Sequence, residues 1–296
     1  MTRRGVRTAR AGLLTAAAAA CAAPAWAQEP APAPSDAAPM IAASDWRVVA
    51  PDNLLVIDTT KGRILVEMTP EAAPGHVARI RLLAKAGFYD GVPWHRVIDG
   101  FMAQTGDPLG TGEGQSWHPD LTAEFTFRRD AQTPFAAVAA PAGALVGFVQ
   151  SLPVQTQPDA VMATTADGKV HAWGLYCPGV AGMARDEAPD SANSQFFLMR
   201  QPYPALDKRY TAWGRVVSGL DVVRALKFSP NPDGVVAEPD RMTRVRVAGD
   251  LPEGERPGVR ALDTASAPFR DLVERTRTAR GADFSACDID LPVEVK

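Results

Sequence analysis

Residues 94–107 read Trp-His-Arg-Val-Ile-Asp-Gly-Phe-Met-Ala-Gln-Thr-Gly-Asp, and this stretch is the most informative of the chain because of the blocks that accompany it. Much later the chain reads Ser-Gln-Phe-Phe-Leu at 194–198. Gly-Met-Ala at 182–184 lies between the two segments, and Ala-Leu-Asp at 205–207 and Tyr-Thr-Ala-Trp-Gly at 210–214 follow them. Several separated blocks in a fixed order are a far more specific signal than any single short motif.

In order and character these blocks resemble the cyclophilin family of peptidyl-prolyl cis/trans isomerases, over roughly 54–247 with one large interruption. The resemblance implies a mainly β fold, a closed antiparallel cyclophilin-like β-barrel capped by helices. Two parts of the chain exceed the family core: an inserted β-rich extension at about 128–178, and a C-terminal segment with a helix. We therefore expect an isomerase domain over 46–250 and a C-terminal extension over 251–296.

The start of the expected domain has the pattern of a strand, a turn, a strand and a helix. Two β-rich runs, 54–57 and 64–68, flank the turn residues 59–62. The helix that follows has Pro74 near its start, and Gly87 is a natural stop. Its apolar residues share one face, and they are Val77, Ile80, Leu83 and Ala84.

The insertion is not of low complexity. Apolar runs at 145–149 and 170–175, with turn residues at 166–169, predict a hairpin that packs on the main body. The insertion is either a lid or extra surface for substrate contact, or an extension with no role in substrate choice. In the C-terminal segment Phe269, Leu272, Val273 and Thr276 recur at helical spacing before Gly281.

Composition is that of an ordinary globular chain, with 296 residues, 46% hydrophobic and 22% charged. Formal net charge is −3, but the first 27 residues carry four arginines and no acid. Without them 27 basic residues face 34 acidic ones, since Lys+Arg is 31 and Asp+Glu is 34 for the whole chain. An acidic chain lacks the general basic footprint of a nucleic-acid binder, so no nucleic-acid partner is expected.

The N-terminus has the pattern of an export signal. Basic residues at 3–10 precede an apolar run at 11–23, and Ala25-Trp26-Ala27 offers small residues for cleavage after Ala27. A twin-arginine route through Arg3-Arg4 and lipoprotein anchoring through Cys21 are the less favoured alternatives. Residues 1–27 are thus expected to be a signal peptide and the Ala/Pro-rich residues 28–45 a linker.

Export predicts a periplasmic protein without an integral membrane segment after cleavage, in a compartment that permits disulfides. Cys177 and Cys287 would be the cysteines that remain, and a bond between them would tie the C-terminal segment to the middle of the domain. Sequence alone leaves their pairing open, because it does not give the distance between their Cα atoms.

The reaction that the resemblance implies is rotation about an X-Pro peptide bond. Its barrier is roughly 18–20 kcal/mol because of amide resonance. No bond breaks, so we expect no cofactor and no metal, and the four histidines lack metal-ligand spacing. Catalysis needs an apolar pocket for the prolyl ring and a donor that stabilises the twisted amide.

Residue by residue, the resemblance assigns the site as follows. Arg96 matches the catalytic arginine, whose N–H fork suits the twisted amide. Gln104 and Gln195 match the polar groups that hold the substrate backbone and orient the arginine, and Ala184 matches a groove position where the backbones approach closely. The apolar residues that match the lining of the proline pocket are Phe101, Met102, Phe197 and Leu206.

Three positions depart from the best-known family pattern. Arg185 stands where an Asn is common and adds charge to the groove, and Tyr210 stands where a His is frequent. Ala205 replaces a Trp that matters for cyclosporin, so weak cyclosporin binding is expected. The expected partners are proline-containing peptides and unfolded exported proteins. The competing hypotheses are a non-catalytic proline-peptide binding module or periplasmic chaperone on the same fold, and an interaction scaffold that uses the insertion.

Overall fold

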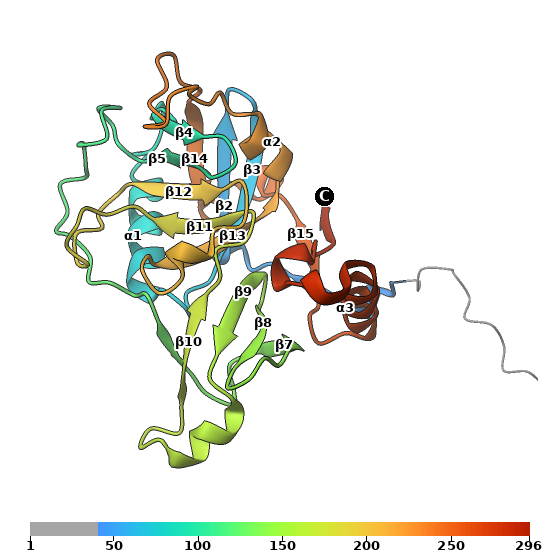
Figure 1. Cartoon of the computed structure of the whole chain (residues 1–296). Coiled ribbons are helices and arrows are strands. Elements are labelled where there is room, and N and C mark those ends of the chain that lie inside the picture. Colours follow the sequence, from blue (N-terminus) through green and yellow to red (C-terminus); the bar gives the residue numbers. More distant parts are fainter. Residues whose placement is uncertain (1–40) are drawn as a thin grey trace, which may run out of the picture. The chain divides into compact units, whose positions relative to one another are not determined.

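The computed structural model describes residues 41–296. The expected signal peptide, Cys21 and nearly all of the expected linker lie outside the described residues. The centre of the molecule is an antiparallel sheet that curls around a hydrophobic core (Figure 1). In spatial order its strands are β14 (Met242–Val247), β2 (Leu54–Thr59), β3 (Gly62–Met68), β13 (Ala212–Ser218), β11 (Val180–Met183), β12 (Phe196–Met199), β5 (Met102–Thr105) and β4 (Arg96–Ile98). The mainly β, cyclophilin-like fold class is confirmed.

The barrel is incompletely closed, which corrects one detail of the expectation. Its end strands, β4 and β14, are not paired with each other. A loop takes the free edge of β4 instead, since Val97 N donates to Gly234 O at 2.8 Å and Val236 N donates to His95 O at 3.0 Å. Just before β4 a bridge between Pro93 and Arg241 joins the two edges, and backbone hydrogen bonds lie on either side of it: Met242 N donates to Val92 O and Trp94 N donates to Asp240 O, both at 2.9 Å.

Helices cover the ends of the barrel. Helix α1 (Pro74–Lys85) begins at Pro74, as predicted, and Gly87 follows it with φ +70°. Its four predicted core residues are fully buried. The distant Glu124 accepts from the backbone N–H groups of Gly75 and His76, both at 3.0 Å, and so caps the first turn. The short helix α2 (Leu220–Ala225) packs against β3.

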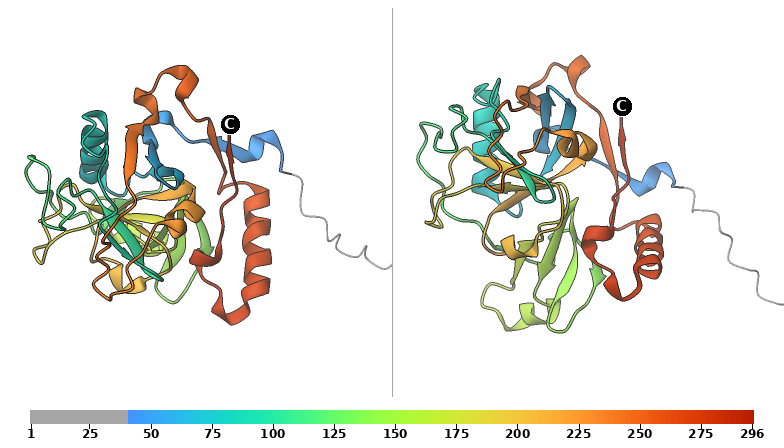
Figure 2. Two further views of the ribbon diagram at one scale, coloured as in Figure 1. Left: turned by 90° about the horizontal axis from the view of Figure 1, so that it is seen from above. Right: turned by 45° about the horizontal axis from the view of Figure 1, so that its top comes forward.

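The inserted residues form a second antiparallel sheet beside the barrel (Figure 2), which confirms a β-rich extension. Its strands, in spatial order, are β6 (Phe127–Arg129), β10 (Val170–Gly174), β9 (Leu152–Thr156), β8 (Leu145–Val149) and β7 (Phe135–Ala139). The predicted turn at 166–169 is present. It joins the 3-10 helix η3 (Asp159–Thr164) to β10, so it does not connect two strands directly.

The C-terminal helix is α3 (Ala267–Arg280), and the predicted residues Phe269 and Val273 are buried. Ser266 Oγ accepts from Phe269 N at 3.3 Å and caps the helix. A three-stranded sheet lies next to α3 and combines both ends of the described chain: β1 (Trp46–Val48), β15 (Val259–Leu262) and β16 (Val293–Val295). The remaining 3-10 helices are η1 (Ala43–Asp45), η2 (Pro51–Asn53), η4 (Pro204–Leu206), η5 (Ala248–Asp250), η6 (Glu253–Glu255), η7 (Gly281–Asp283) and η8 (Ala286–Asp288).

Buried charges connect these parts. Arg47 of β1 donates to the buried carboxylate of Glu67 in β3 at 2.5 and 2.7 Å, which fixes the small sheet to the barrel. Arg215 of β13 donates to Ser151 O of the insertion at 3.3 Å and to Ile289 O of the C-terminal segment at 3.4 Å. Burial lowers the pKa of Arg215 to about 10, so this guanidinium stays charged at neutral pH.

A disulfide adds a covalent connection. Cys177, which precedes β11, is bonded to Cys287 in η8, with the Cα atoms 4.9 Å apart. Cys177 is fully buried, in a hydrophobic cluster that also contains Leu152 of the insertion and Phe197 of β12. Among the helices of residues 41–296, none combines the length and the hydrophobicity that a membrane-spanning segment requires.

Candidate active site

One cavity of about 190 Å³ gathers the predicted site residues on the outer face of β4, β5 and β12. Gln195 lines the adjoining cavity, of about 200 Å³, together with Gln104, Ala184 and Arg185. The first cavity is lined by Arg96, Phe101, Met102, Gln104, Ala184, Arg185, Phe197, Leu206 and Tyr210. The structure therefore brings together residues from distant parts of the chain.

Strand register explains why three of these side chains meet. Arg96 of β4 lies opposite Gln104 of β5, and Gln104 lies opposite Phe197 of β12. Directly opposed residues of antiparallel strands project from the same face of the sheet. Met102, two residues before Gln104, projects from that face as well.

A chain of hydrogen bonds crosses the polar half of the site. Arg96 Nη1 donates to Gln104 Oε1 at 3.2 Å, and Gln104 Nε2 donates to Gln195 Oε1 at 2.9 Å. Gln195 Nε2 then donates to Gly112 O at 2.8 Å and Gly114 O at 2.9 Å. The two amides thus hold the arginine in one orientation.

Arg96 is surrounded by carbonyl and amide oxygens. Its Nε donates to Asp233 O at 2.8 Å, and within residues 41–296 no carboxylate lies at ion-pair distance from it. Burial lowers the pKa of Arg96 below its ordinary value, against the opposing influence of Tyr210 and Asp233. A guanidinium remains protonated in spite of such a shift, so the site holds a positive charge without a directly paired carboxylate among residues 41–296.

The other half of the site is apolar. Met102, Phe197 and Leu206 are buried, and Leu206 comes from η4. The ring of Tyr210 meets Phe197 edge-on, with centroids 5.9 Å apart. These side chains form a small hydrophobic pocket directly beside the guanidinium of Arg96.

Arg185 is held at the rim of the groove. Its Nε and Nη2 donate to Arg209 O at 3.1 and 3.0 Å, and its Nη1 donates to Asp186 O at 2.7 Å. The guanidinium also lies over the ring of Tyr210, 4.6 Å from the centroid. Arg185 therefore lines both cavities with a side chain that its hydrogen bonds hold in place, and it also brings a positive charge to the groove.

Tyr203 is a site residue that the sequence reading missed. Tyr203 is 43% exposed, and its ring lies 4.5 Å from the ring of Phe101, measured between centroids. Tyr203 does not line the cavity itself, but it packs on Phe101, which does, and so adds an aromatic ring two residues before Ala205. The available signal was an aromatic residue two positions before Ala205.

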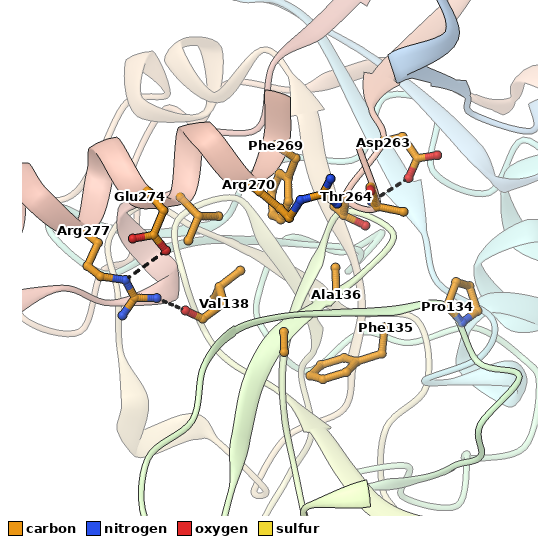
Figure 3. Close-up of a pocket in the computed structure, with 13 residues that line it drawn as sticks. Pro134, Phe135, Ala136, Val138, Asp263, Thr264, Phe269, Arg270, Glu274 and Arg277 are labelled. Carbon is orange, nitrogen blue, oxygen red and sulfur yellow. Dashed lines mark hydrogen bonds and ion pairs between the residues drawn. The ribbon is translucent and has the colours of Figure 1, made fainter. Parts of the chain in front are cut away.

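A larger cavity, of about 690 Å³, lies between β7 and α3 (Figure 3). Its floor and walls include Phe135, Val138 and Phe269, and Arg277 at its rim donates to Val138 O. None of the predicted site residues lines it. Over the described part of the chain, no group of three or more potential metal-binding side chains is present.

Comparisons with known proteins show which family this chain belongs to. The family model described as "Cyclophilin type peptidyl-prolyl cis-trans isomerase/CLD" matches residues 54–247. A probable peptidyl-prolyl cis-trans isomerase of Brucella suis biovar 1 is 34% identical over 212 residues, which cover 68% of this chain and 85% of the relative. Peptidyl-prolyl cis-trans isomerase B of Bacillus subtilis is 31% identical over 187 residues, which cover 63% of this chain and 92% of that protein. The crystal structure of cyclophilin AquaCyp293 from Hirschia baltica has a TM-score of 0.77 at 34% identity, covering 84% of this chain and 93% of that one.

Proposed function

Since this chain belongs to the cyclophilin-type peptidyl-prolyl cis-trans isomerases, we propose that Arg96 lowers the barrier to X-Pro rotation and that the substrates are exported proteins. The prolyl ring occupies the apolar half of the 190 Å³ cavity. The guanidinium then lies beside the amide that twists. The observation that carries this assignment is the fixed orientation of Arg96 by Gln104, next to that pocket.

The chemistry follows from amide resonance. As the X-Pro bond twists, resonance is lost and the prolyl nitrogen gains a lone pair that can accept a hydrogen bond. Nε and Nη1 of Arg96 already have partners in Asp233 and Gln104, and no acceptor within residues 41–296 bonds Nη2. Nη2 is thus free to donate to the twisted amide. A donor that is oriented before the substrate arrives stabilises the transition state more than the planar ground state.

Substitution of Arg96 tests this role. We expect Arg96→Ala to slow the on-enzyme cis/trans exchange of an Ala-Pro-Phe peptide by about a hundredfold or more, by analogy with the loss of one preorganised donor. Exchange NMR measures the rate, and the matched control Arg96→Lys keeps the charge but loses the planar fork. If folded Arg96→Ala exchanges the peptide as fast as wild type, the donor is another group. If wild type binds the peptide without accelerating exchange, the protein is a proline-peptide binding module.

The proposed substrates are X-Pro bonds in unfolded or loop segments of envelope proteins. The export pattern within residues 1–27 supports this location. Fractionation of cells that produce the full chain tests it: recovery in the cytoplasm contradicts the proposal, and recovery in the membrane that Cys21→Ser abolishes indicates lipidation instead. A short apolar pocket discriminates weakly between neighbouring side chains, so substrate preference should be broad.

Weak cyclosporin binding remains a prediction. Ala205 is exposed in η4 and presents only a methyl group. Tyr203 supplies a ring from a different backbone position. Titration with cyclosporin tests the prediction, and affinity comparable to that of a Trp-containing family member would show that Tyr203 replaces the missing ring.

A further inference from the structure

The end of the insertion lies directly behind the proline pocket. Tyr176 follows β10 and is 1% exposed. Its ring stacks on that of Phe197, with centroids 5.8 Å apart and planes inclined by 28°. The ring of Phe197, a lining residue of the pocket, therefore rests on Tyr176.

The backbone of Tyr176 also holds the loop that supplies Leu206. Tyr176 N donates to Asp207 Oδ1 at 3.0 Å, and Tyr203 N donates to Tyr176 O at 2.9 Å. These two bonds join the residues immediately before and after η4. One residue thus contacts both the strand side and the loop side of the pocket.

Gly182 of β11 makes room for this contact. A Cβ atom at position 182 would lie 2.5 Å from Phe197 Cζ and 2.8 Å from Tyr176 Cε1. Both distances are below the contact distance of carbon atoms, which is about 3.5–4.0 Å. The two rings are therefore packed against a backbone that has no side chain, and neither can shift toward β11.

From these contacts we infer that Tyr176 is a positioning residue, through which the insertion sets the binding geometry of the proline pocket. Without its ring, Phe197 loses its support on the side away from the substrate. The role of Tyr176 rests on the proposed function in one respect, that the cavity beside Arg96 binds the prolyl ring. The insertion then supports the pocket through the ring of Tyr176 behind Phe197, without covering the groove or contacting the substrate.

The test uses three variants of the mature protein. Tyr176→Leu removes the ring, and Tyr176→Phe keeps it while deleting a buried hydroxyl that has no hydrogen-bond partner among the described residues. Phe148→Leu is a matched structural control, since Phe148 is another buried aromatic of the insertion but packs on Phe269, with centroids 5.8 Å apart. NMR titration with Ala-Pro-Phe gives the Kd and the exchange rate of the bound peptide, and circular dichroism gives the folded fraction.

We expect Tyr176→Leu to weaken the Kd about tenfold while the bound exchange rate stays within about twofold of wild type, because Arg96 and Gln104 are unaffected. Tyr176→Phe should restore wild-type affinity, and Phe148→Leu should lose stability without a change in Kd. An unchanged Kd for folded Tyr176→Leu, or equal weakening by Phe148→Leu, would overturn the inference. Failure of the Arg96 mechanism would appear separately, as a loss of acceleration in wild type with these differences in Kd intact.

Discussion

At the scale of single residues, Asp207 makes the stability of the protein depend on pH. Burial raises the pKa of Asp207 to about 6, from an ordinary value of 3.8, although the Tyr176 N–H and Lys208 oppose the shift. Between these two values the folded protein holds a proton that the unfolded chain releases. The free energy of unfolding should therefore fall as the pH rises through this window, and the contribution is lost above pH 6.

The matched variant is Asp207→Asn, which stays neutral and keeps an oxygen to accept from Tyr176 N. Urea unfolding at about pH 4 and pH 7 should show a fall in stability for wild type that exceeds that of the variant by on the order of 1–2 kcal/mol. Parallel pH dependence in the two proteins would mean that Asp207 is ionised at an ordinary pKa in the folded state.

The site residues differ in how far sequence could reveal them. Arg96, Gln104 and Phe197 belong to ordered blocks, so the resemblance identified them and the strand register explains their meeting. Tyr203 and Tyr176 were not predicted, because their contacts depend on the folded conformation. Tyr203 contacts Phe101 from a position two residues before Ala205. Tyr176 stacks on Phe197 where Gly182 has no side chain to fill the space. Neither contact leaves a periodic or spaced pattern along the chain.

At the scale of secondary-structure elements, the disulfide joins η8 to the segment before β11 across 110 residues of sequence. Closing a loop of that size lowers the entropy of the unfolded chain and contributes roughly 3–5 kcal/mol. The double variant Cys177→Ser, Cys287→Ser should lose about that much stability in denaturant unfolding. Wild type unfolded in excess reductant is the control and should follow the same curve. Equal midpoints for oxidised wild type and the variant would show that the cysteines are not joined in solution.

Helices and strands were predictable where the spacing of apolar residues reflects a single buried face. Amphipathic spacing predicted α1 and α3, because each helix buries one face. Full closure of the barrel was wrong in detail, because residues 234–236 compete for the edge of β4, and such a loop has no periodic signature. The order of strands in the inserted sheet, with β10 between β6 and β9, was equally beyond the sequence pattern.

At the scale of the whole molecule, the described residues 41–296 belong to one compact unit. One hydrophobic cluster is shared by the barrel, the insertion and the C-terminal segment, and includes Leu65, Phe148, Phe269 and Ile289. Truncation after Asp250 would expose the barrel and insertion sides of this cluster to water. We expect the truncated protein to be degraded by protease under conditions in which the full mature chain survives, and to bind a hydrophobic dye. A truncated protein that unfolds with the full-length midpoint would instead identify residues 251–296 as an independent appendage.

The small sheet beside α3 can form only late in the synthesis of the chain. Strand β1 pairs with β15, so Trp46 meets Leu262 only after more than two hundred intervening residues have appeared. At a synthesis rate of about 5–20 residues per second, the first strand waits roughly 10–40 s for its partner. A chain that emerges from its N-terminus therefore passes through an interval in which β1 has no strand to pair with, although every strand of the main sheet has already been made.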